Sequence, residues 1–257
     1  MNLHLKEKVI LVTGGGSGIG EAIVSQLALE GAFPVIISKK EDENIRALET
    51  LQAAGGFGIQ IVADLSKPEE CQLAVQKTID TFGRIHGLVN NAGINDGVGL
   101  TNGSYEQFMA SLHQNVVHYF LMAKHCLPYI KEAKGAILNI SSKVAETGQG
   151  GTSGYAAANG ARNALTREWA LELAPSGVRV NAIVVSECWT PMYQKWISSQ
   201  ENSEEALAQV KAKIPLGNRL TTPQEIAAMA VFLLSKQSSH TTGQLIHIDG
   251  GYVHLDN

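Results

Sequence analysis

Two hydroxyl side chains, Ser142 and Tyr155, are of types that can move a proton at a reacting carbon. When a hydride leaves or joins a carbon that carries oxygen, a positioned phenol can take or give the hydroxyl proton, and a serine can hold the oxygen. Ser142 follows the apolar run AILNIS, so we expect it at the carboxyl end of a strand, where open α/β sheets bind ligands. The pair therefore indicates an oxidation or reduction at a carbon bearing oxygen.

A glycine-rich turn follows the first predicted strand and opens an amphipathic helix. Its spacing is Thr13-Gly14-xxx-Gly18-x-Gly20. Backbone N–H groups and a helix N-terminus at such a turn favour an anion, and the glycines let a pyrophosphate approach closely. A glycine cluster alone can be no more than a tight turn, but its place after the first strand favours a dinucleotide site. The residues expected to bind the cofactor here are Gly14, Ser17, Gly18, Ile19 and Gly20.

The end of the second predicted strand favours NADP, with NAD as the alternative. An acidic side chain at this place would bond the ribose hydroxyls of NAD and repel the 2′-phosphate of NADP. The chain reads PVIISKK, with Ser38, Lys39 and Lys40 and no carboxylate before Glu41. We therefore expect Ser38 and Lys39 to contact the cofactor. The other interpretation is that the lysines are solvated at the start of a loop.

The elements that position these residues follow from an alternation of short β-branched runs with helix-length segments. We expect an α/β fold, a single-domain doubly wound parallel sheet (Rossmann fold) with helices on both faces, over residues 1–257. The predicted strands are Val9–Thr13, Val35–Ser38, Gly58–Val62, Gly87–Asn90, Ala136–Ile140, Arg179–Val184 and Leu245–Ile248. The predicted helices are Gly18–Glu30, Asp42–Ala54, Pro68–Phe82, Ser104–Ile130, Gly154–Leu173 and Pro223–Leu234. A polar stretch near residues 190–220 interrupts the alternation and is interpreted as a cap over the substrate site.

Composition and charge exclude several classes of protein. A net charge of −4 without a dense basic patch argues against binding to nucleic acid or to an anionic membrane. Cys71, Cys126 and Cys188 are too widely spaced for a disulfide framework, and neither they nor the histidines form a metal-ligand pattern, so we expect no metal. No apolar run approaches the roughly 20 residues that span a bilayer, and the first residues lack a signal-peptide pattern. We expect a cytoplasmic protein.

Several separated motifs, in this order, resemble the short-chain dehydrogenase/reductase family over nearly the whole chain. They are TGGGSGIG, ADL at 63–65, NNAG at 90–93, Asn115 in HQNVVHYF, ILNISS ending at Ser142, Tyr155, GVRVNAI at 177–183 and TTGQLIHIDGGY. Within the family, NAGINDGVGL, ISSK, TGQG, SGYAA and LTREWA are most similar to sugar-oxidising members such as L-fucose dehydrogenases. The resemblance implies a nicotinamide-dependent oxidoreductase that acts on CH–OH groups.

The resemblance also implies further cofactor contacts. Asp64 and Leu65 would lie by the adenine, and Thr190 would face the nicotinamide carboxamide. Family members usually carry Pro-Gly a few residues before that threonine, whereas this chain has Val185 and Ser186, so we expect a different loop wall there. The remaining residues that would line the cofactor site are Asn90, Ala92, Gly93, Tyr155, Asn159 and Cys188.

The chain departs from the family one helical turn after the tyrosine, where Asn159 replaces a lysine. In the family that lysine adds a positive charge near the phenol and bonds the nicotinamide ribose. A free tyrosine has a pKa of about 10, so only about one phenol in a thousand is ionised at neutral pH. The resemblance assigns catalysis to Asn115, which would help hold a proton-relay water, and to Ser142, Tyr155 and Asn159. We expect Asn159 to keep a cofactor contact and to weaken catalysis.

Two cations could compensate for the missing lysine. Lys143 is adjacent to Ser142, although neighbours on a strand point to opposite faces. Arg162 lies one turn beyond Asn159 on roughly the same helical face, and a long guanidinium could fold back. Such an arginine is more often a solvated or interface charge, so the sequence leaves this point open.

Polar residues on the loops beyond the strand ends suit a small substrate with several hydroxyl groups. Flat aromatic faces, Trp189 and Trp196, are expected beside them and favour a sugar or polyol over a steroid or an acyl chain, and the resemblance implies a sugar such as L-fucose. Many loop residues of this kind are simply solvated. The residues expected to contact the substrate are Asn95, Asp96, Ser142, Gln149, Tyr155, Glu187 and Tyr193, with Glu146 also on these loops.

Three hypotheses for the whole protein stay open at this stage. The first is an NAD(P)-dependent oxidoreductase whose activity Asn159 impairs. The second is a catalytically weak or inactive dinucleotide-binding sensor or partner subunit, and the third is an asparagine introduced to trap a complex. The family resemblance further implies a homotetramer or homodimer packed through the helices Ser104–Ile130 and Gly154–Leu173.

Overall fold

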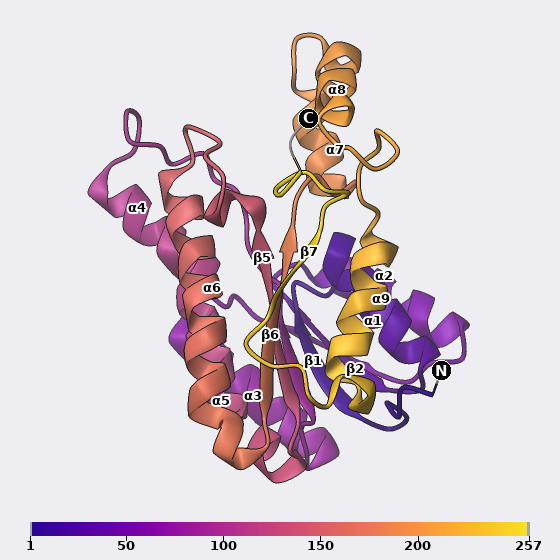
Figure 1. Cartoon of the computed structure of the whole chain (residues 1–257). Helices are drawn as coiled ribbons and strands as arrows, with labels where there is room; N and C mark the ends of the chain where they lie inside the picture. Colours follow the sequence, from indigo (N-terminus) through magenta and orange to yellow (C-terminus); the bar gives the residue numbers. More distant parts are fainter. Residues whose placement is uncertain (1, 256–257) are drawn as a thin grey trace.

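Seven parallel strands form one sheet in the computed structural model, which describes residues 2–255 (Figure 1). The strands are β1 (Val9–Thr13), β2 (Phe33–Ser38), β3 (Ile59–Val62), β4 (Gly87–Asn90), β5 (Ala136–Ser142), β6 (Arg179–Val185) and β7 (Leu245–Ile248). Their order is β3-β2-β1-β4-β5-β6-β7, and every neighbouring pair is parallel. The order reverses between β1 and β4, and in such sheets a ligand binds in the crevice above that point.

Helices cover both faces of the sheet, as the sequence predicts. One face carries α1 (Gly18–Leu29), α2 (Glu41–Ala53) and α9 (Pro223–Leu234), and the other carries α3 (Pro68–Phe82), α5 (His118–Ala133) and α6 (Ser153–Leu173). Successive residues of β1 alternate between the two cores: Ile10 and Val12 lie in one, and Val9 and Leu11 in the other. Burial on both faces explains why this strand reads as a continuous apolar run. The predicted fold class is confirmed.

One predicted helix contains an irregular turn that the sequence did not reveal. The segment Ser104–Ile130 forms α4 (Tyr105–Leu112), a π-helical turn η1 (His113–Val117) and then α5. A capping box, in which Ser104 and Gln107 bond each other's backbone N–H groups, fixes the start of α4. The widened π turn places Asn115 inside the molecule, and such turns often occur at functional sites.

Strand ends differ slightly from the predicted ones. β2 starts at Phe33 rather than at the predicted Val35, and so includes Pro34, which lacks an N–H donor. The cost is small here because β3 pairs with β2 only from Val35 onward. β5 extends to Ser142, which brings the serine hydroxyl to the carboxyl edge of the sheet.

The stretch near residues 190–220, which we interpreted as a cap, contains two helices that the sequence pattern did not reveal. They are α7 (Pro191–Ser198) and α8 (Ser203–Ala212), and they stand beyond the carboxyl ends of the strands (Figure 1). Short 3-10 turns complete the chain at η2 (Lys143–Ala145), η3 (Ala174–Ser176) and η4 (Lys236–Ser238). Among the described residues, none of the helices has the length and apolar character needed to cross a bilayer.

Candidate active site

Hydrogen bonds join the turn after β1 to the turn after β4. The Thr13 hydroxyl oxygen accepts from the backbone N–H groups of Asn91 (2.8 Å) and Ala92 (3.0 Å). The Asn91 side-chain amide donates to the Thr13 carbonyl at 2.9 Å. Gly14 has φ 64°, and a Cβ there would lie 2.9 Å from the Asn91 amide nitrogen, so only glycine fits this close approach. These contacts fix the floor of the crevice at the switch point.

The N-terminus of α1 is open to an anion. Ser17 occupies the N-cap position but its side chain does not bond the backbone N–H groups of the first turn, so no side-chain cap covers them. Gly18 has φ 58°, and a Cβ on it would lie 3.5 Å from the Thr190 side chain. The glycine turn therefore faces Thr190, as the predicted dinucleotide site requires. The residues present fit a pyrophosphate at this helix end.

The edge beyond β2 and β3 carries the residues expected to choose between NAD and NADP. The Ser38 hydroxyl donates to Asn44 Oδ1 at 2.7 Å, and Lys40 pairs with Glu43 at 2.6 Å. Lys39 forms no ion pair with any residue of the described chain, although its charge acts on Asp64. Bonds from Ser66 hold the pKa of Asp64 below its usual value, while Leu65 is buried. The exposed positive charge of Lys39 is therefore available to a phosphate.

Ser142 and Tyr155 lie on two elements that pack together at the carboxyl edge of the sheet. Ser142 ends β5, and its oxygen accepts from the Val144 N–H at 3.5 Å. Tyr155 is in the first turn of α6, which packs on β5 and η2. The preceding Ser141 hydroxyl donates to the carbonyl of Asn159 at 3.4 Å, which ties the strand end to the turn after Tyr155. Both Ser142 and Tyr155 are partly exposed.

Arg162 folds back from α6 toward the tyrosine. Its Nε and Nη2 donate to the backbone carbonyl of Asn115 at 2.7 and 2.5 Å, and its Nη1 donates to the carbonyl of Ile140 at 3.2 Å. The guanidinium carbon lies 4.3 Å from the ring centre of Tyr119 and 6.0 Å from that of Tyr155. Only 3% of Arg162 is exposed. The sequence left this arrangement open, and the structure decides it in favour of the inward orientation.

Asn159 is fully buried and supports Arg162. Its amide Nδ2 donates to the Tyr155 carbonyl at 2.8 Å, and its Oδ1 accepts from Arg162 Nη1 at 2.9 Å. Both ends of the amide are thus satisfied inside the protein. The geometry gives Asn159 the role of an acceptor for the guanidinium and lends no support to the expected direct contact with a ribose.

Two neighbours make room for the guanidinium. A Cβ on Gly93 would lie 2.7 Å from Arg162 Nη2, so any larger residue would displace the arginine. Asn115 Oδ1 accepts from the Ile94 N–H at 2.8 Å, and its Nδ2 donates to the Ser111 carbonyl at 3.0 Å. The backbone carbonyl of Asn115, the residue expected to help hold a proton-relay water, accepts from the guanidinium.

Lys143 is not the compensating cation. Its ammonium pairs with Glu187 and lies 3.8 Å from the ring centre of Tyr252. Burial, together with Glu187, raises the pKa of the Tyr193 phenol. Two predicted substrate residues, Glu187 and Tyr193, therefore lie near one another.

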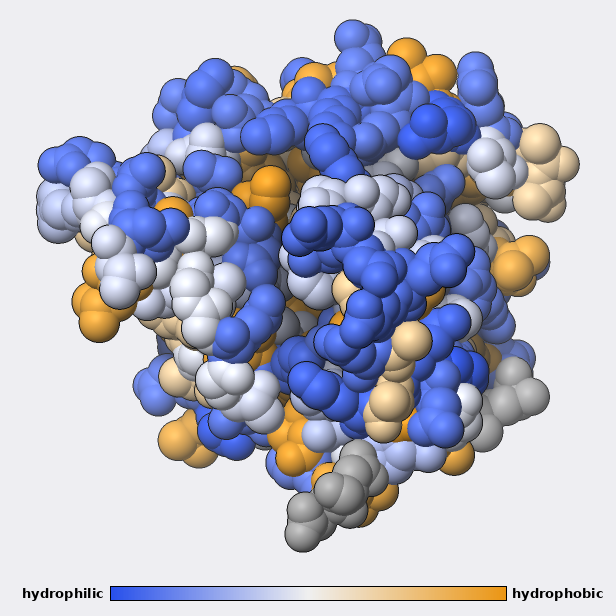
Figure 2. Space-filling model, turned by 90° about the horizontal axis from the view of Figure 1, so that it is seen from above, coloured by the Kyte–Doolittle hydropathy of each residue, from blue (hydrophilic) through white to orange (hydrophobic). Residues whose placement is uncertain are grey.

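The other predicted substrate residues are not gathered into one enclosed pocket. Asn95, Asp96 and Gln149 are exposed on loops. Seen from above the carboxyl ends of the strands, the surface is mainly hydrophilic with scattered apolar residues (Figure 2).

Two predicted cofactor residues have buried side chains. Asn90 donates to the Tyr119 carbonyl at 3.3 Å and to Asn139 Oδ1 at 3.1 Å, so its amide links β4, α5 and β5. The Cys188 thiol packs in the core beneath α1 and α9, and burial raises its pKa to about 12. Neither side chain faces an open cleft.

Two positioning residues escaped the sequence prediction, and a third was left undecided. Thr13 and Asn91 lie within quoted motifs, but their roles depend on contacts between turns 78 residues apart in the chain. Arg162 was a candidate, and the signal that could have selected it is the pairing of Asn159 with Gly93, a small residue that leaves space for the guanidinium.

A doubly wound sheet with a glycine turn at its switch point and a serine–tyrosine pair at its carboxyl edge defines a short-chain dehydrogenase/reductase. The sequence model of a family described as enoyl-(acyl carrier protein) reductase matches residues 14–253. This chain belongs to the short-chain dehydrogenase/reductase family, whose members bind nicotinamide cofactors and act on CH–OH groups.

Relatives with different substrates are similarly close. The 3-oxoacyl-[acyl-carrier-protein] reductase FabG of Thermotoga maritima is 36% identical, with 98% of this chain and 100% of that protein covered. The L-fucose dehydrogenase of Bos taurus is 34% identical, with 98% and 91% covered. The crystal structure of Cj0485 dehydrogenase has a TM-score of 0.94 at 45% identity, covering 100% of this chain and 98% of that one. These similarities establish the family. They do not place L-fucose dehydrogenases nearer to this chain than relatives with other substrates.

Proposed function

We propose that this protein is an NAD(P)-dependent oxidoreductase that interconverts a hydroxyl and a carbonyl group of a small polar substrate, with NADP as its preferred cofactor. The observation that carries the proposal is the buried guanidinium of Arg162, which supplies a positive charge near Tyr155 where Asn159 cannot. L-Fucose is the first substrate to test.

The cofactor residues follow from the fit described above. Gly14, Ser17 and Gly18 would hold the pyrophosphate, Lys39 would meet a 2′-phosphate, and Thr190 would lie beside the nicotinamide. When bound, the nicotinamide accepts or supplies the hydride.

Ser142 and Tyr155 carry the proton chemistry in this mechanism. The Ser142 hydroxyl orients the substrate oxygen, and the Tyr155 phenol takes its proton during oxidation or returns it during reduction. The positive charge of Arg162 stabilises the negative charge that develops on the phenol oxygen. The guanidinium carbon lies 6.0 Å from the centre of the Tyr155 ring, and two unit charges at such a separation attract by about 3 kcal/mol at an effective dielectric constant of 20.

Nothing neutralises the guanidinium locally. No carboxylate of residues 2–255 lies within ion-pair distance of Arg162, and its partners are carbonyl and amide oxygens. Neutral acceptors satisfy the hydrogen-bond donors while leaving the charge to act on the tyrosine. Since a guanidinium does not release a proton at working pH, we infer that Tyr155 exchanges its proton through its exposed side rather than through Arg162.

The substrate class rests on the groups beyond the strand ends. The rings of Trp189, Tyr193 and Trp196 lie next to one another, with neighbouring centres 6.3 and 5.2 Å apart. Glu187 lies beside Tyr193, which places a carboxylate next to flat apolar faces. That combination favours a sugar or polyol, and the loop residues Asn95, Asp96 and Gln149 would add hydrogen bonds on its solvent side.

The test is steady-state turnover with NADP+ and NAD+ on L-fucose and other aldoses, with reduction of a 3-oxoacyl thioester as the comparison. We expect activity on aldoses, a loss of about 100-fold or more in Tyr155→Phe, and a loss of about 10- to 100-fold in kcat in Arg162→Gln. Arg167→Gln, an exposed arginine on the same helix, is the control and should keep full activity.

Two outcomes would contradict the proposal. Tight cofactor binding without turnover of any substrate would support the sensor hypothesis. Full activity in Arg162→Gln, with the fold intact by circular dichroism, would show that the arginine is not the source of the catalytic charge.

A further inference from the structure

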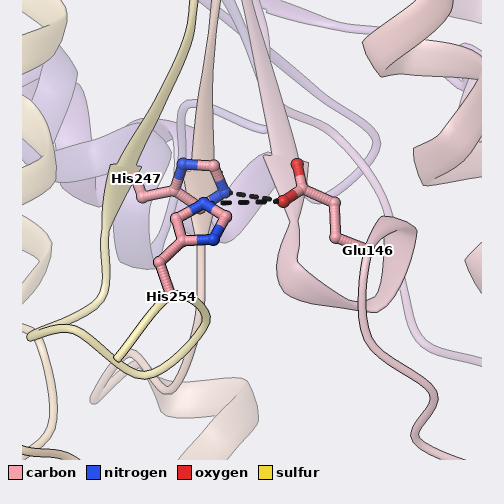
Figure 3. A group of neighbouring side chains, drawn as sticks. All are labelled: Glu146, His247 and His254. Carbon is pink, nitrogen blue, oxygen red and sulfur yellow. Dashed lines mark hydrogen bonds and ion pairs between the residues drawn. The ribbon is translucent and has the colours of Figure 1, made fainter. Parts of the chain in front are cut away.

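Glu146, His247 and His254 bring three potential metal ligands together (Figure 3). Glu146 Oε2 lies 2.9 Å from His247 Nε2 and 3.9 Å from His254 Nε2. One ligand atom from each residue lies within 4.8 Å of the other two. In Figure 3 both imidazole rings face the same carboxylate.

The three residues come from distant parts of the chain. Glu146 follows η2, His247 lies in β7, and His254 lies in the C-terminal turn. Glu146 and His247 are 101 residues apart in sequence, so spacing could not have revealed the cluster. The expectation of no metal was drawn from local patterns alone, and it did not consider this group.

This cluster is separate from the catalytic centre. It borders an open hollow of about 660 Å³ lined in part by Asn163, Arg167 and Gln244, and neither Ser142 nor Tyr155 lines that hollow. Glu146, which we had placed among the substrate loops, therefore points to a different part of the molecule.

We propose that Glu146, His247 and His254 bind a divalent cation of the zinc type. Two imidazoles and one carboxylate form a known zinc ligand set, with a fourth position for water. Bonds of about 2.1 Å in a tetrahedral site place ligand atoms roughly 3.3 Å apart, between the two distances seen here. Binding would draw the His254 ring inward by roughly 1 Å, and the 63% exposure of its side chain leaves room for this movement.

Supporting contacts around the ligands agree with this assignment. Asn163 Nδ2 donates to Glu146 Oε1 at 3.3 Å, which turns Oε2 toward the histidines. Bonds of this kind orient first-sphere ligands in metal sites. A hydrogen bond explains the placement of His247 without a metal. The His254 ring packs edge-to-face on His247, with centres 4.4 Å apart, and its Nε2 faces the same Glu146 oxygen at 3.9 Å, so both imidazoles converge on one carboxylate.

A metal at this place would fasten the C-terminal segment to the loop after Ser142. Tyr252, in the same segment, already packs on Lys143, the residue next to Ser142. The bound ion would therefore stabilise the loop beside the catalytic serine without touching the substrate. We assign the site a structural role.

The test is isothermal titration calorimetry of Zn2+ into protein from which bound metal has been removed with a chelator. The chelator itself is removed before the titration. We expect one saturable site per chain, with affinity in the micromolar range or tighter, and a rise in Tm on Zn2+ addition. His254→Ala should weaken binding by at least about tenfold, and Asn163→Ala by about tenfold through loss of the supporting bond.

His254 is exposed, so its removal should not disturb folding, whereas His247 lies in a strand. His240→Ala, at an exposed histidine outside the cluster, is the matched control and should bind Zn2+ like the parent. Co2+ provides a second readout, because a four-coordinate site gives intense visible absorption that His254→Ala should lose. The absence of saturable binding, or equal affinity in the parent and His254→Ala, would overturn the proposal.

Discussion

At the residue scale, the position that departs from the family is one half of a pair. Asn159 is uncharged where the family has a lysine. Its side-chain oxygen Oδ1 accepts a hydrogen bond from Arg162, whose guanidinium carries a positive charge. Arginine suits this place because its planar fork can bond several carbonyls at once while it stays ionised. The same fork reaches the carbonyls of Asn115 and Ile140.

A lysine at position 159 should therefore harm the protein while Arg162 is present. We expect Asn159→Lys to lower the free energy of unfolding by roughly 2 to 4 kcal/mol, because two buried cations would repel and the guanidinium would lose an acceptor. We also expect no gain in kcat. The double variant Asn159→Lys with Arg162→Gln should recover much of both quantities, measured by urea unfolding and turnover. A higher kcat in the single variant would contradict the pairing.

Lys39 sets the choice of cofactor in our proposal. Lys39→Glu should raise the KM for NADP+ by about tenfold or more, equivalent to about 1.4 kcal/mol, since a carboxylate repels the 2′-phosphate. The KM for NAD+ should change less. Lys40→Glu is a suitable comparison, because Lys40 is already engaged with Glu43. Equal effects of Lys39→Glu on both cofactors would place the 2′-phosphate elsewhere.

At the element scale, most helices and strands could be predicted and their mutual contacts could not. Hydrophobic period and turn residues located α3 and α9 at their observed bounds, because a capping proline and an amphipathic pattern are local signals. The π turn at Asn115 was missed, because it is held by the Ser111 carbonyl, the Ile94 backbone and Arg162, which belong to three different segments. The α7 and α8 helices were missed because they are short and lie in a polar stretch that interrupts the alternation of strands and helices.

The start of β1 should make the fold sensitive to acid. The Val9 N–H donates to His86 Nδ1 at 3.0 Å, and burial, with Lys8 and Arg84 nearby, lowers the pKa of His86 to about 4. The folded state therefore favours neutral His86, so its contribution is present above pH 6.5 and is lost as pH falls toward 4. At pH 5 we expect a loss of about 1 to 2 kcal/mol relative to pH 8.

Urea unfolding at both pH values would check this. His86→Gln should reduce the loss, and His240→Gln, at an exposed histidine, should not. Burial also lowers the pKa of His118 to about 3, but that residue is unchanged in both variants, so the comparison isolates His86. An identical acid response in His86→Gln and the parent would contradict the assignment.

At the scale of the whole molecule, two large apolar side chains are exposed on the helices of the α5 and α6 face. Phe120 of α5 is 48% exposed and Leu171 of α6 is 77% exposed. The family resemblance implies that subunits pack through these two helices, and the two side chains are exposed apolar groups that such packing would bury. We expect the parent protein to be a dimer or tetramer through this face.

The double variant Phe120→Glu, Leu171→Glu should shift the protein toward a smaller species in size-exclusion chromatography with light scattering. The charges would be buried in the contact and would cost more there than on a free surface. Leu29→Glu, on α1 of the opposite face and 70% exposed, is the control and should leave the mass unchanged. An unchanged mass in the double variant would exclude this face as the interface.

The sequence by itself determined the doubly wound sheet, the glycine turn and the serine and tyrosine at its carboxyl edge, because strand and helix periods and turn residues are local properties. Only the tertiary structure decided that Arg162 turns inward, that Asn159 supports it, and that Glu146 meets His247 and His254. Those outcomes depend on which distant segments lie side by side once the core is packed. A long side chain such as arginine or glutamate has several rotamers of similar energy, and only packing against its neighbours selects one of them.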